Sequence, residues 1–274
     1  MPNRPWIVIK GAGDIASAVA HRIKQAGGAP VLLEVPLPLI TRRRMAFAPV
    51  LHGEPAELEG LSARLCATPE EVVACMEDPT LVPVVESADY SIPFPGLAAV
   101  VVDGRMRKKE QPPLQLGEAP LVLGIGPGFQ AGHHVHGVVE SNWGETLGAI
   151  SWEGAAQGYT GIHRKVEGHG ADRYLYAPHA GVFRTTRNLL EPVQAGEVVG
   201  MVQGGAGETP LTVLIGGVLR GLAYDGSTVQ AGAKLVEVEP RGDVGQCTGI
   251  AERPGRIADG VLAAIRERAP QVLA

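Results

Sequence analysis

The sequence predicts two domains, an α/β domain built on a parallel sheet and a small all-β domain that follows it. Three observations predict this organisation. A strand, a glycine loop, a helix and a second apolar strand follow one another within residues 6–34. An internal repeat occupies much of the region from Tyr174 to Glu239. The chain, at 274 residues, is long enough for two domains that each bury a core.

Composition and charge exclude several classes of protein. The formal net charge of −5 offers no basic surface, so nucleic acid is not expected as a partner. No apolar segment approaches the length of a membrane span, and the first residues do not resemble a secretory signal. The three cysteines contain no CxxC pair, which argues against a disulfide framework and favours a reducing compartment. We therefore expect a cytoplasmic protein without a membrane partner.

The first domain begins with a complete strand-helix-strand unit. An apolar strand over residues 6–10 leads into the loop GAGDIA, and apolar residues at helical spacing then continue to the glycines at 27 and 28. The next run, VLLEV, has the continuous apolar character of a buried parallel strand. This order predicts a Rossmann-like parallel-sheet domain over residues 1–170, with further strands at LVPVV and LAAVVV.

The glycine loop of this unit is the main candidate binding site. Gly11 allows a tight turn out of the strand, and Gly13 lets the backbone approach a pyrophosphate at the start of the helix. Glu34 stands where an acidic side chain can accept hydrogen bonds from a ribose. We therefore predict a nucleotide or dinucleotide ligand at Gly11, Ala12, Gly13, Asp14, Ile15 and Glu34. The alternative is a packing loop that binds nothing.

Two basic runs could complete a phosphate site. The first follows Glu34 and places Arg43 and Arg44 among the predicted binding residues. The second follows the strand LAAVVV, at the edge where open α/β sheets bind ligands, and contains Asp103, Arg105, Arg107, Lys108 and Lys109. The alternative for both runs is a solvated charged surface. Neither run distinguishes NAD from NADP.

A glycine- and histidine-rich segment, PLVLGIGPGFQAGHHVHGVVES, begins at residue 120. Gly126 and Gly128 lie in a loop whose successive amides can hold an anion. The loop lacks the lysine of a Walker motif, which excludes a P-loop for ATP. Although His133, His134 and His136 are close in sequence, no acidic ligand completes a set with metal spacing, so no metal site is predicted. His136 is instead a candidate hydrogen-bonding or acid-base group.

The second domain is predicted from the repeat. VQAG at residues 193–196 recurs 36 residues later, and Gly181-Val182 recurs as Gly217-Val218 with the same offset. Each copy offers only short strands, so two copies must close over one another about a pseudo-twofold axis. The pattern resembles the barrel-sandwich hybrid of biotinyl and lipoyl domains and predicts such a domain over residues 171–240. The joining segment QGGAGETP has no lysine, which excludes an attached biotin or lipoate.

Residues 241–274 contain a loop and a segment with helical spacing, GRIADGVLAAIRERAP, which we expect to pack back on the first domain. The loop includes Cys247, whose simplest interpretation is a buried free thiol because no base or cation is identifiable beside it. No acid, base and nucleophile stand at a spacing that predicts a catalytic residue.

Several stretches, taken in order, are similar to the YqeB family of selenium-dependent molybdenum hydroxylase system proteins: VIKGAGDIASAVAHRI, VVDGRMRKK, GIGPGFQAGHHVHGVVES, LYAPHAGVF and VEPRGDVGQCTGI. The resemblance implies an accessory protein that matures or supplies cofactor to a molybdenum hydroxylase client. The implied ligand is a dinucleotide form of the molybdenum cofactor, and Arg220 is a further family-like position. His134 departs from the pattern, in which an acidic residue stands at that place.

Three hypotheses therefore remain open at this point. The first is the accessory protein that binds a nucleotide-type molecule at the GAGDIA loop. The second is an NAD(P)-dependent oxidoreductase, suggested by the same loop together with Glu34. The third is a non-catalytic scaffold that docks a partner through the duplicated domain. Whether the protein is an enzyme, and whether it forms a homo-oligomer, are left open.

Overall fold

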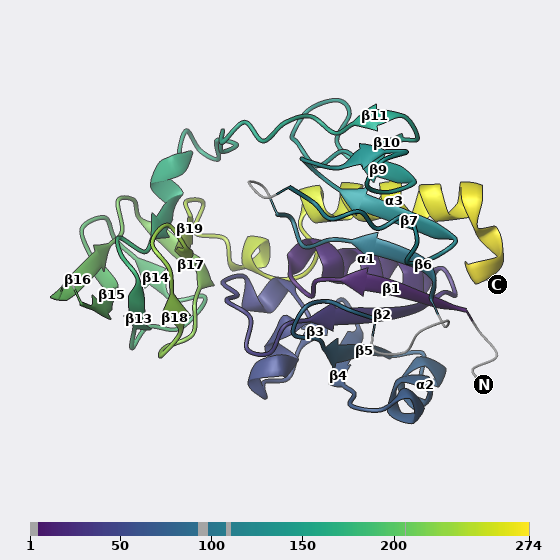
Figure 1. Ribbon diagram of the computed structural model, residues 1–274. Helices are drawn as coiled ribbons and strands as arrows, with labels where there is room; N and C mark the ends of the chain where they lie inside the picture. The colour runs from purple at the N-terminus through teal and green to yellow at the C-terminus, as the bar shows by residue number, and fades with distance from the viewer. Residues whose placement is uncertain (1–4, 93–97, 108–110, 206, 274) are drawn as a thin grey trace. The chain divides into compact units, whose positions relative to one another are not determined.

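The computed structural model describes residues 5–92, 98–107, 111–205 and 207–273 (Figure 1). Contacts within the chain divide it into two compact units. Unit 1 comprises residues 1–38, 45–160 and 250–274, and unit 2 comprises residues 39–44 and 161–249. The boundaries expected from the sequence lay after residues 170 and 240. Unit 2 therefore also takes in the short segment 39–44, which lies far from the rest of the unit in the sequence.

Unit 1 is built around a nine-stranded mixed sheet with the strand order β10-β9-β7-β6-β1-β2-β5-β4-β3 (Figure 1). The following strands run parallel to one another: β1 (Trp6–Lys10), β2 (Ala29–Glu34), β4 (Leu61–Leu65), β5 (Leu81–Glu86), β6 (Ala98–Asp103), β7 (Leu121–Ile125) and β9 (Gly137–Val139). Two short edge strands pair antiparallel, β3 (Glu57–Leu58) with β4 and β10 (Ile150–Ser151) with β9. Every residue of β1 and β7 is buried, which explains their continuous apolar sequences.

Three helices belong to unit 1: α1 (Asp14–Gln25), α2 (Pro69–Glu77) and α3 (Glu252–Arg268). Helices α1 and α3 pack against each other, and α3 buries Ile257, Val261 and Ile265. Gly260 lets the loop between β9 and β10 approach α3 closely, because a Cβ there would lie 1.9 Å from the carbonyl oxygen of Gly148. Among the described residues, no helix combines the length and apolar character that crossing a bilayer requires.

Smaller elements complete unit 1. Strands β8 (Gln130–Ala131) and β11 (Gly154–Ala155) form a two-stranded antiparallel sheet. Among the described residues, unit 1 also contains the 3-10 helices η2 (Ala48–His52) and η5 (Pro270–Leu273), unit 2 contains η3 (Ala171–Arg173) and η4 (Val244–Cys247), and η1 (Arg43–Met45) spans the boundary after residue 44.

Unit 2 contains two four-stranded antiparallel sheets, ordered β12-β19-β17-β14 and β16-β15-β13-β18. Their bounds are β12 (Tyr174–Tyr176), β13 (Gly181–Arg184), β14 (Pro192–Val193), β15 (Val198–Gly204), β16 (Gly207–Thr212), β17 (Gly217–Leu222), β18 (Thr228–Val229) and β19 (Lys234–Glu239). Apolar side chains of both sheets form one core, with Phe183, Leu219 and Val236 among its fully buried members.

The internal repeat recurs at the level of strands. An offset of 36 residues carries β12, β13, β14 and β15 onto β16, β17, β18 and β19 respectively. Each sheet contains two strands from each copy: β12 and β14 pair with β19 and β17, while β13 and β15 pair with β18 and β16. The two copies are therefore interleaved and share one core.

The fold class predicted from the sequence was wrong. Unit 1 does not have the parallel sheet of a Rossmann-like domain, because its nine-stranded sheet is mixed and has antiparallel pairs at both edges. Within the described ranges, no helix connects β6 to β7 or β7 to β9, so the sheet is not doubly wound. Unit 2 forms separate small antiparallel sheets and not the predicted biotinyl-like barrel. A buried strand has the same apolar sequence in either kind of sheet, which is why the sequence misled.

Candidate functional site

Three neighbouring parallel strands of unit 1 each end in a buried charged residue. Lys10 ends β1, Glu34 ends β2 and Asp103 ends β6, and their exposed fractions are 4%, 7% and 1%. Because β1 lies between the other two strands, the three side chains share the carboxyl edge of the sheet. Ligands of open α/β sheets bind at this edge, and buried ionisable groups gather at functional sites. This edge is therefore the candidate site.

The predicted glycine loop crosses the same edge between β1 and α1. Gly11 has a φ of +107°, and a Cβ there would lie 3.4 Å from the backbone of Gly104, so the position favours glycine. Gly13 precedes α1 with extended backbone, and a Cβ on it would meet no described atom within 4 Å. The first turn of α1 thus begins beside open space, with amides that have no partner within the helix.

Glu34 fixes this loop by a hydrogen bond to its backbone. One carboxylate oxygen accepts the backbone amide of Ala12 at 2.8 Å, and the other accepts the amide of Val35 at 3.0 Å and the hydroxyl of Tyr90. Burial, followed by the neighbouring charge of Glu34, raises the pKa of the Tyr90 hydroxyl, so the phenol keeps its proton. Both oxygens of Glu34 are therefore engaged within the protein.

Asp103 is the centre of a second group of contacts at this edge. Arg105 donates to it from Nε at 2.9 Å and Gln115 donates from its side-chain amide at 2.9 Å. Burial acts to raise the pKa of Asp103, but the hydrogen bonds and charge of Arg105 outweigh burial and hold the pKa below its ordinary value. Lys10 donates from Nζ to Gln115 at 2.9 Å and to Glu118 at 2.7 Å.

A cation-π contact joins the two groups. The guanidinium carbon of Arg105 lies 4.7 Å from the centre of the Tyr90 ring, and Tyr90 in turn contacts Glu34. A continuous series of contacts thus runs from the glycine loop to Lys10. Sequence reasoning singled out Asp103 and Arg105 but missed Lys10 and Tyr90; a lysine at the end of the otherwise apolar strand WIVIK was the available signal for Lys10.

The loops after β7 and β9 reach the same edge of the sheet. Gly126 has a φ of +88°, and a Cβ there would lie 2.6 Å from Oγ of Ser141 and 3.3 Å from the side chain of Met106. Ser141 is fully buried, and no described residue hydrogen-bonds to its hydroxyl. Gly128, two residues along the loop, is exposed and has a φ of +92°.

Among the other predicted site residues, one lies in unit 1 at the opposite end of the parallel strands. His136 lies at the amino end of β7, where its Nδ1 accepts the amide of Val122 at 2.9 Å. Arg43 and Arg44 belong to unit 2, and Arg43 donates to the carbonyl of Leu222 at 3.1 Å. Lys108 and Lys109 lie outside the described residues. The structure thus brings together Gly11 to Ile15, Glu34 and the loop at Gly126.

No group of three or more histidine, cysteine, aspartate or glutamate side chains is placed to hold a metal ion in the described part of the chain. The neighbouring histidines at 133 and 134 have rings 4.5 Å apart. Burial, with a smaller contribution from His133, lowers the pKa of His134. Its Nδ1 accepts the amide of Gln130 at 3.1 Å, so this histidine serves the local turn.

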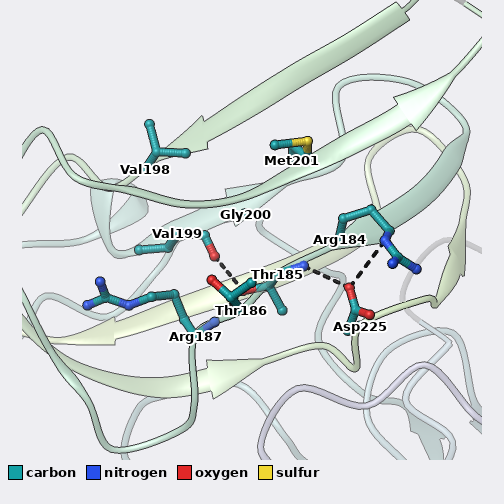
Figure 2. A pocket seen from close by; sticks show the side chains of 9 residues that line it. All are labelled: Arg184, Thr185, Thr186, Arg187, Val198, Val199, Gly200, Met201 and Asp225. Atoms are coloured by element: carbon teal, nitrogen blue, oxygen red, sulfur yellow. Dashed lines mark hydrogen bonds and ion pairs between the residues drawn. The ribbon is translucent and has the colours of Figure 1, made fainter.

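Unit 2 has a surface hollow of about 260 Å³, shown in Figure 2. Within the hollow, Asp225 contacts Arg184 at 3.4 Å and accepts the amide of Thr185 at 2.9 Å (Figure 2). Arg187 pairs at 2.9 Å with Glu191, which lies outside the lining. The hollow is smaller than most pockets for organic ligands, which span about 300–1,000 Å³. It is therefore a weaker candidate than the carboxyl edge of unit 1.

No model of a known protein family matches the chain. Over 259 residues the chain is 34% identical to the protein of Escherichia coli (strain K12) whose curated name is "Uncharacterized protein YqeB". The alignment covers 94% of this chain and 47% of that protein. The chain thus spans about half the length of this curated relative. The similarity agrees with the family name reached from the sequence, and it shows no link to molybdenum hydroxylases.

Similar solved structures include a succinylglutamate desuccinylase/aspartoacylase from Rhodobacter sphaeroides, 12% identical, with 86% of this chain and 85% of that one covered and a TM-score of 0.27. A second is the product-bound ectoine utilization protein EutE (DoeB) from Ruegeria pomeroyi, 9% identical, with coverage of 86% and 85% and a TM-score of 0.27. Likeness at this level carries no functional argument for this chain.

The functions predicted from the sequence were wrong. The curated relative is named an uncharacterized protein, and that name refers neither to molybdenum hydroxylase maturation nor to an NAD(P)-dependent reaction. The docking scaffold finds no support in these comparisons either. The geometry gives its own reason against a dinucleotide, because Glu34 is only 7% exposed and both of its oxygens already accept hydrogen bonds from Ala12, Val35 and Tyr90, which disfavours a ribose there.

Proposed function

We propose that unit 1 binds a small anionic molecule, carrying a carboxylate or a phosphate group, at the carboxyl edge of its sheet. The observation that carries the proposal is the glycine loop, which is fixed in place while open space lies in front of Gly13. Anions bind at such positions because the first amides of a helix point outward and the helix dipole is positive there.

The loop is pre-organised for binding. Glu34 fixes the amide of Ala12, and the amide of Gly104 donates to the carbonyl of Lys10 at 2.9 Å, which brings the β6 loop against Gly11. A binding group that is already in place loses little conformational entropy when its ligand arrives. The buried charges at the ends of β1, β2 and β6 support the proposal as positioning groups.

The hydroxyl of Ser141 is a second feature at this edge that favours a polar ligand. It is buried without a hydrogen-bond partner among the described residues, and such a group costs free energy unless water or a ligand satisfies it. Gly126 begins the loop after β7 directly beside this hydroxyl, and any larger residue at position 126 would collide with it.

The expected ligand is small. A dinucleotide needs an acceptor for its ribose, and Glu34 is already occupied. A molecule of the size of inorganic phosphate or of a dicarboxylate needs only the loop amides and neighbouring donors. We therefore expect inorganic phosphate and succinate to serve as probes, and NAD⁺ to bind no better than phosphate.

Titration calorimetry of the full chain with phosphate and with succinate tests the proposal. The variant Gly13→Val fills the open space without strain, because the backbone at Gly13 is extended and its Cβ position is unobstructed. We expect at least one probe to bind and its affinity to fall at least about tenfold in Gly13→Val, which corresponds to about 1.4 kcal/mol.

Gly158→Val is the matched control, because a Cβ at Gly158 also meets no described atom within 4 Å and its φ lies outside the left-handed region. This control is expected to bind like the natural chain. Absence of binding by every probe, or equal affinity of a folded Gly13→Val variant, would overturn the proposal.

A further inference from the structure

A charged cluster in unit 2 lies apart from the groups used above. We call it the arginine cluster: two carboxylates, Glu237 and Glu239, contacted by the cationic side chains of Arg42, Arg173, Arg220, Lys234 and Arg241. Both glutamates are fully buried, with exposed fractions of 0%. They stand on β19, whose neighbours in the sheet are β12 and β17.

Glu237 receives the strongest pairing of the cluster. Arg42 donates to it from Nε and from a terminal nitrogen, both at 2.8 Å, in a bidentate arrangement. Lys234 donates to the same carboxylate at 3.2 Å. Both oxygens of Glu237 therefore already accept hydrogen bonds from Arg42 and Lys234, without any contribution from the other cations of the cluster.

The short segment 39–44 brings Arg42 to this sheet. The amide of Leu222 donates to the carbonyl of Thr41 at 2.9 Å, which lays the segment along β17. Gly221 makes the approach close, because a Cβ there would lie 3.1 Å from Glu237 and 3.3 Å from Thr41. The sequence left the basic run after Glu34 open between part of a phosphate site and a solvated charged surface, and the structure places its first member, Arg42, in this cluster.

The cluster has more positive than negative charge. Five cations face two carboxylates, which leaves three positive charges among the groups in contact. Two further acidic residues, Asp243 and Glu167, are exposed and act on Arg241. The buried members, Arg173, Arg220, Glu237 and Glu239, balance in charge, so the surplus lies on Arg42, Lys234 and Arg241, whose side chains are 21%, 33% and 37% exposed.

Arg220 is the least satisfied member. Only 9% of it is exposed, and the one hydrogen bond that it makes among the described residues runs from a terminal nitrogen to Glu239 at 3.4 Å. Its Nε is buried, has no hydrogen-bond partner in the described part of the chain, and lies 3.9 Å from Glu237. Burial, followed by repulsion from Arg42, lowers the pKa of Arg220 even though both glutamates act to raise it. A guanidinium has five N–H donors, so the structure leaves acceptors missing here.

We propose that the arginine cluster is a binding site for a compact multivalent anion, one that carries two or more phosphate or carboxylate groups. Such an anion supplies the missing acceptors of Arg220 and balances the surplus of positive charge. Guanidinium groups suit it, because their planar forks match both phosphate and carboxylate oxygens.

Two cations of the cluster are partly exposed and form its rim. The side chains of Lys234 and Arg241 are 33% and 37% exposed, whereas that of Arg173 is 3% exposed. The ring of Tyr174 borders the rim, with the Nζ atom of Lys234 5.4 Å from its centre. The anion is therefore expected to enter past Lys234 and Arg241 and to reach the buried guanidinium beyond them.

Titration calorimetry with pyrophosphate and with citrate, at about 0.15 M salt to suppress weak surface binding, tests the proposal. The two probes distinguish a phosphate ligand from a carboxylate ligand. The decisive variants are Arg220→Gln, which removes the unsatisfied group, and Lys234→Gln, which removes a partly exposed cation. We expect each to weaken binding at least tenfold.

Arg184→Gln is the matched control. It removes one positive charge from the other sheet of unit 2, where Arg184 is 49% exposed and pairs with Asp225 (Figure 2). Gly13→Val is a second control, because it alters only the site proposed in unit 1. We expect both controls to bind like the natural chain.

Four results would overturn the assignment: no binding of either probe, equal weakening by Arg184→Gln, loss of binding in Gly13→Val alone, or unchanged affinity in Lys234→Gln. Should Arg220→Gln not fold, Lys234→Gln decides the outcome. If the titrations with phosphate and succinate contradict the site at Gly13, the proposal for the arginine cluster still stands, since the two sites share no residue.

Discussion

The backbone amide of Ala12 donates a hydrogen bond to the carboxylate of Glu34 across 2.8 Å, although the two residues lie 22 positions apart in the chain. This contact joins the loop after β1 to the end of β2. Because it is buried and charged, it stabilises the loop more than an exposed hydrogen bond would.

Glu34→Gln is expected to lower the free energy of unfolding by about 2 kcal/mol, since an uncharged amide accepts the buried donors less well. Urea denaturation followed by circular dichroism measures the change. Glu86→Gln is the matched control: Glu86 pairs in register with Glu34 on β5 but is exposed, and we expect a change within about 0.5 kcal/mol there. Equal effects of the two substitutions would refute the role of the Ala12 contact.

Acid is expected to destabilise unit 2 through Glu237. Burial acts to raise the pKa of this carboxyl, but the charges of Arg42 and Lys234 hold the pKa well below its ordinary value of about 4.3. A depressed pKa in the folded state contributes stability that is fully present above about pH 4.3 and is lost as pH falls through the lower folded value.

Unfolding measured between pH 7 and pH 3 should therefore show a steeper loss below about pH 4.3 in the natural chain than in Glu237→Gln, by up to about 1.4 kcal/mol per pH unit. Glu208→Gln, which replaces an exposed glutamate of the same unit, should keep the natural slope. Parallel curves for all three proteins would show that Glu237 does not control the acid response.

Two opposing effects determine how Gly260→Ala changes the free energy of unfolding. Helix propensity alone favours alanine over glycine by about 1 kcal/mol. The added Cβ, however, would lie 1.9 Å from the carbonyl oxygen of Gly148, a rigid backbone atom. We expect packing to win and the free energy of unfolding to fall by at least about 2 kcal/mol. Gly117→Ala, at an unobstructed position, is the comparison, and a more stable Gly260→Ala protein would contradict the packing of α3.

Thr68→Ala should cost about 1 kcal/mol, because it removes a capping box. The hydroxyl of Thr68 accepts the amide of Glu71 at 3.3 Å, and the carboxylate of Glu71 accepts the amides of Thr68 and of Ala67. Thermal unfolding measures the loss, and Thr68→Ser should restore most of it. If serine and alanine proved equally destabilising, the hydroxyl would not be acting as a cap.

Local structure was predictable from the sequence where one segment decides it. The strand at Trp6–Lys10 and the helix that starts at Asp14 both follow from apolar spacing and end residues. The strands repeated at an offset of 36 residues also appear where the VQAG turns indicate them. These features depend on neighbours within a few residues of each other.

Tertiary pairing was not predictable in the same way. Edge strands of two residues, such as β3 and β10, are too short to show an alternation of apolar and polar residues, so the sequence did not predict that the sheet is mixed. Glu34 was predicted to accept from a ribose because its partners Ala12 and Tyr90 are recognisable only when the chain is folded. The basic run after Glu34 was a candidate for the same site, but its first arginine, Arg42, pairs with Glu237, which lies 195 positions away.

The interleaving of the repeat copies has a consequence for the history of unit 2. Each sheet draws two strands from each copy, so one copy alone presents unpaired strand edges and cannot complete either sheet. Two separate polypeptides with one copy each could form the same pairings as a symmetric homodimer. Fusion of such subunits into one gene would free the copies to diverge, and the glutamates at 237 and 239 stand where the first copy has Met201 and Gln203.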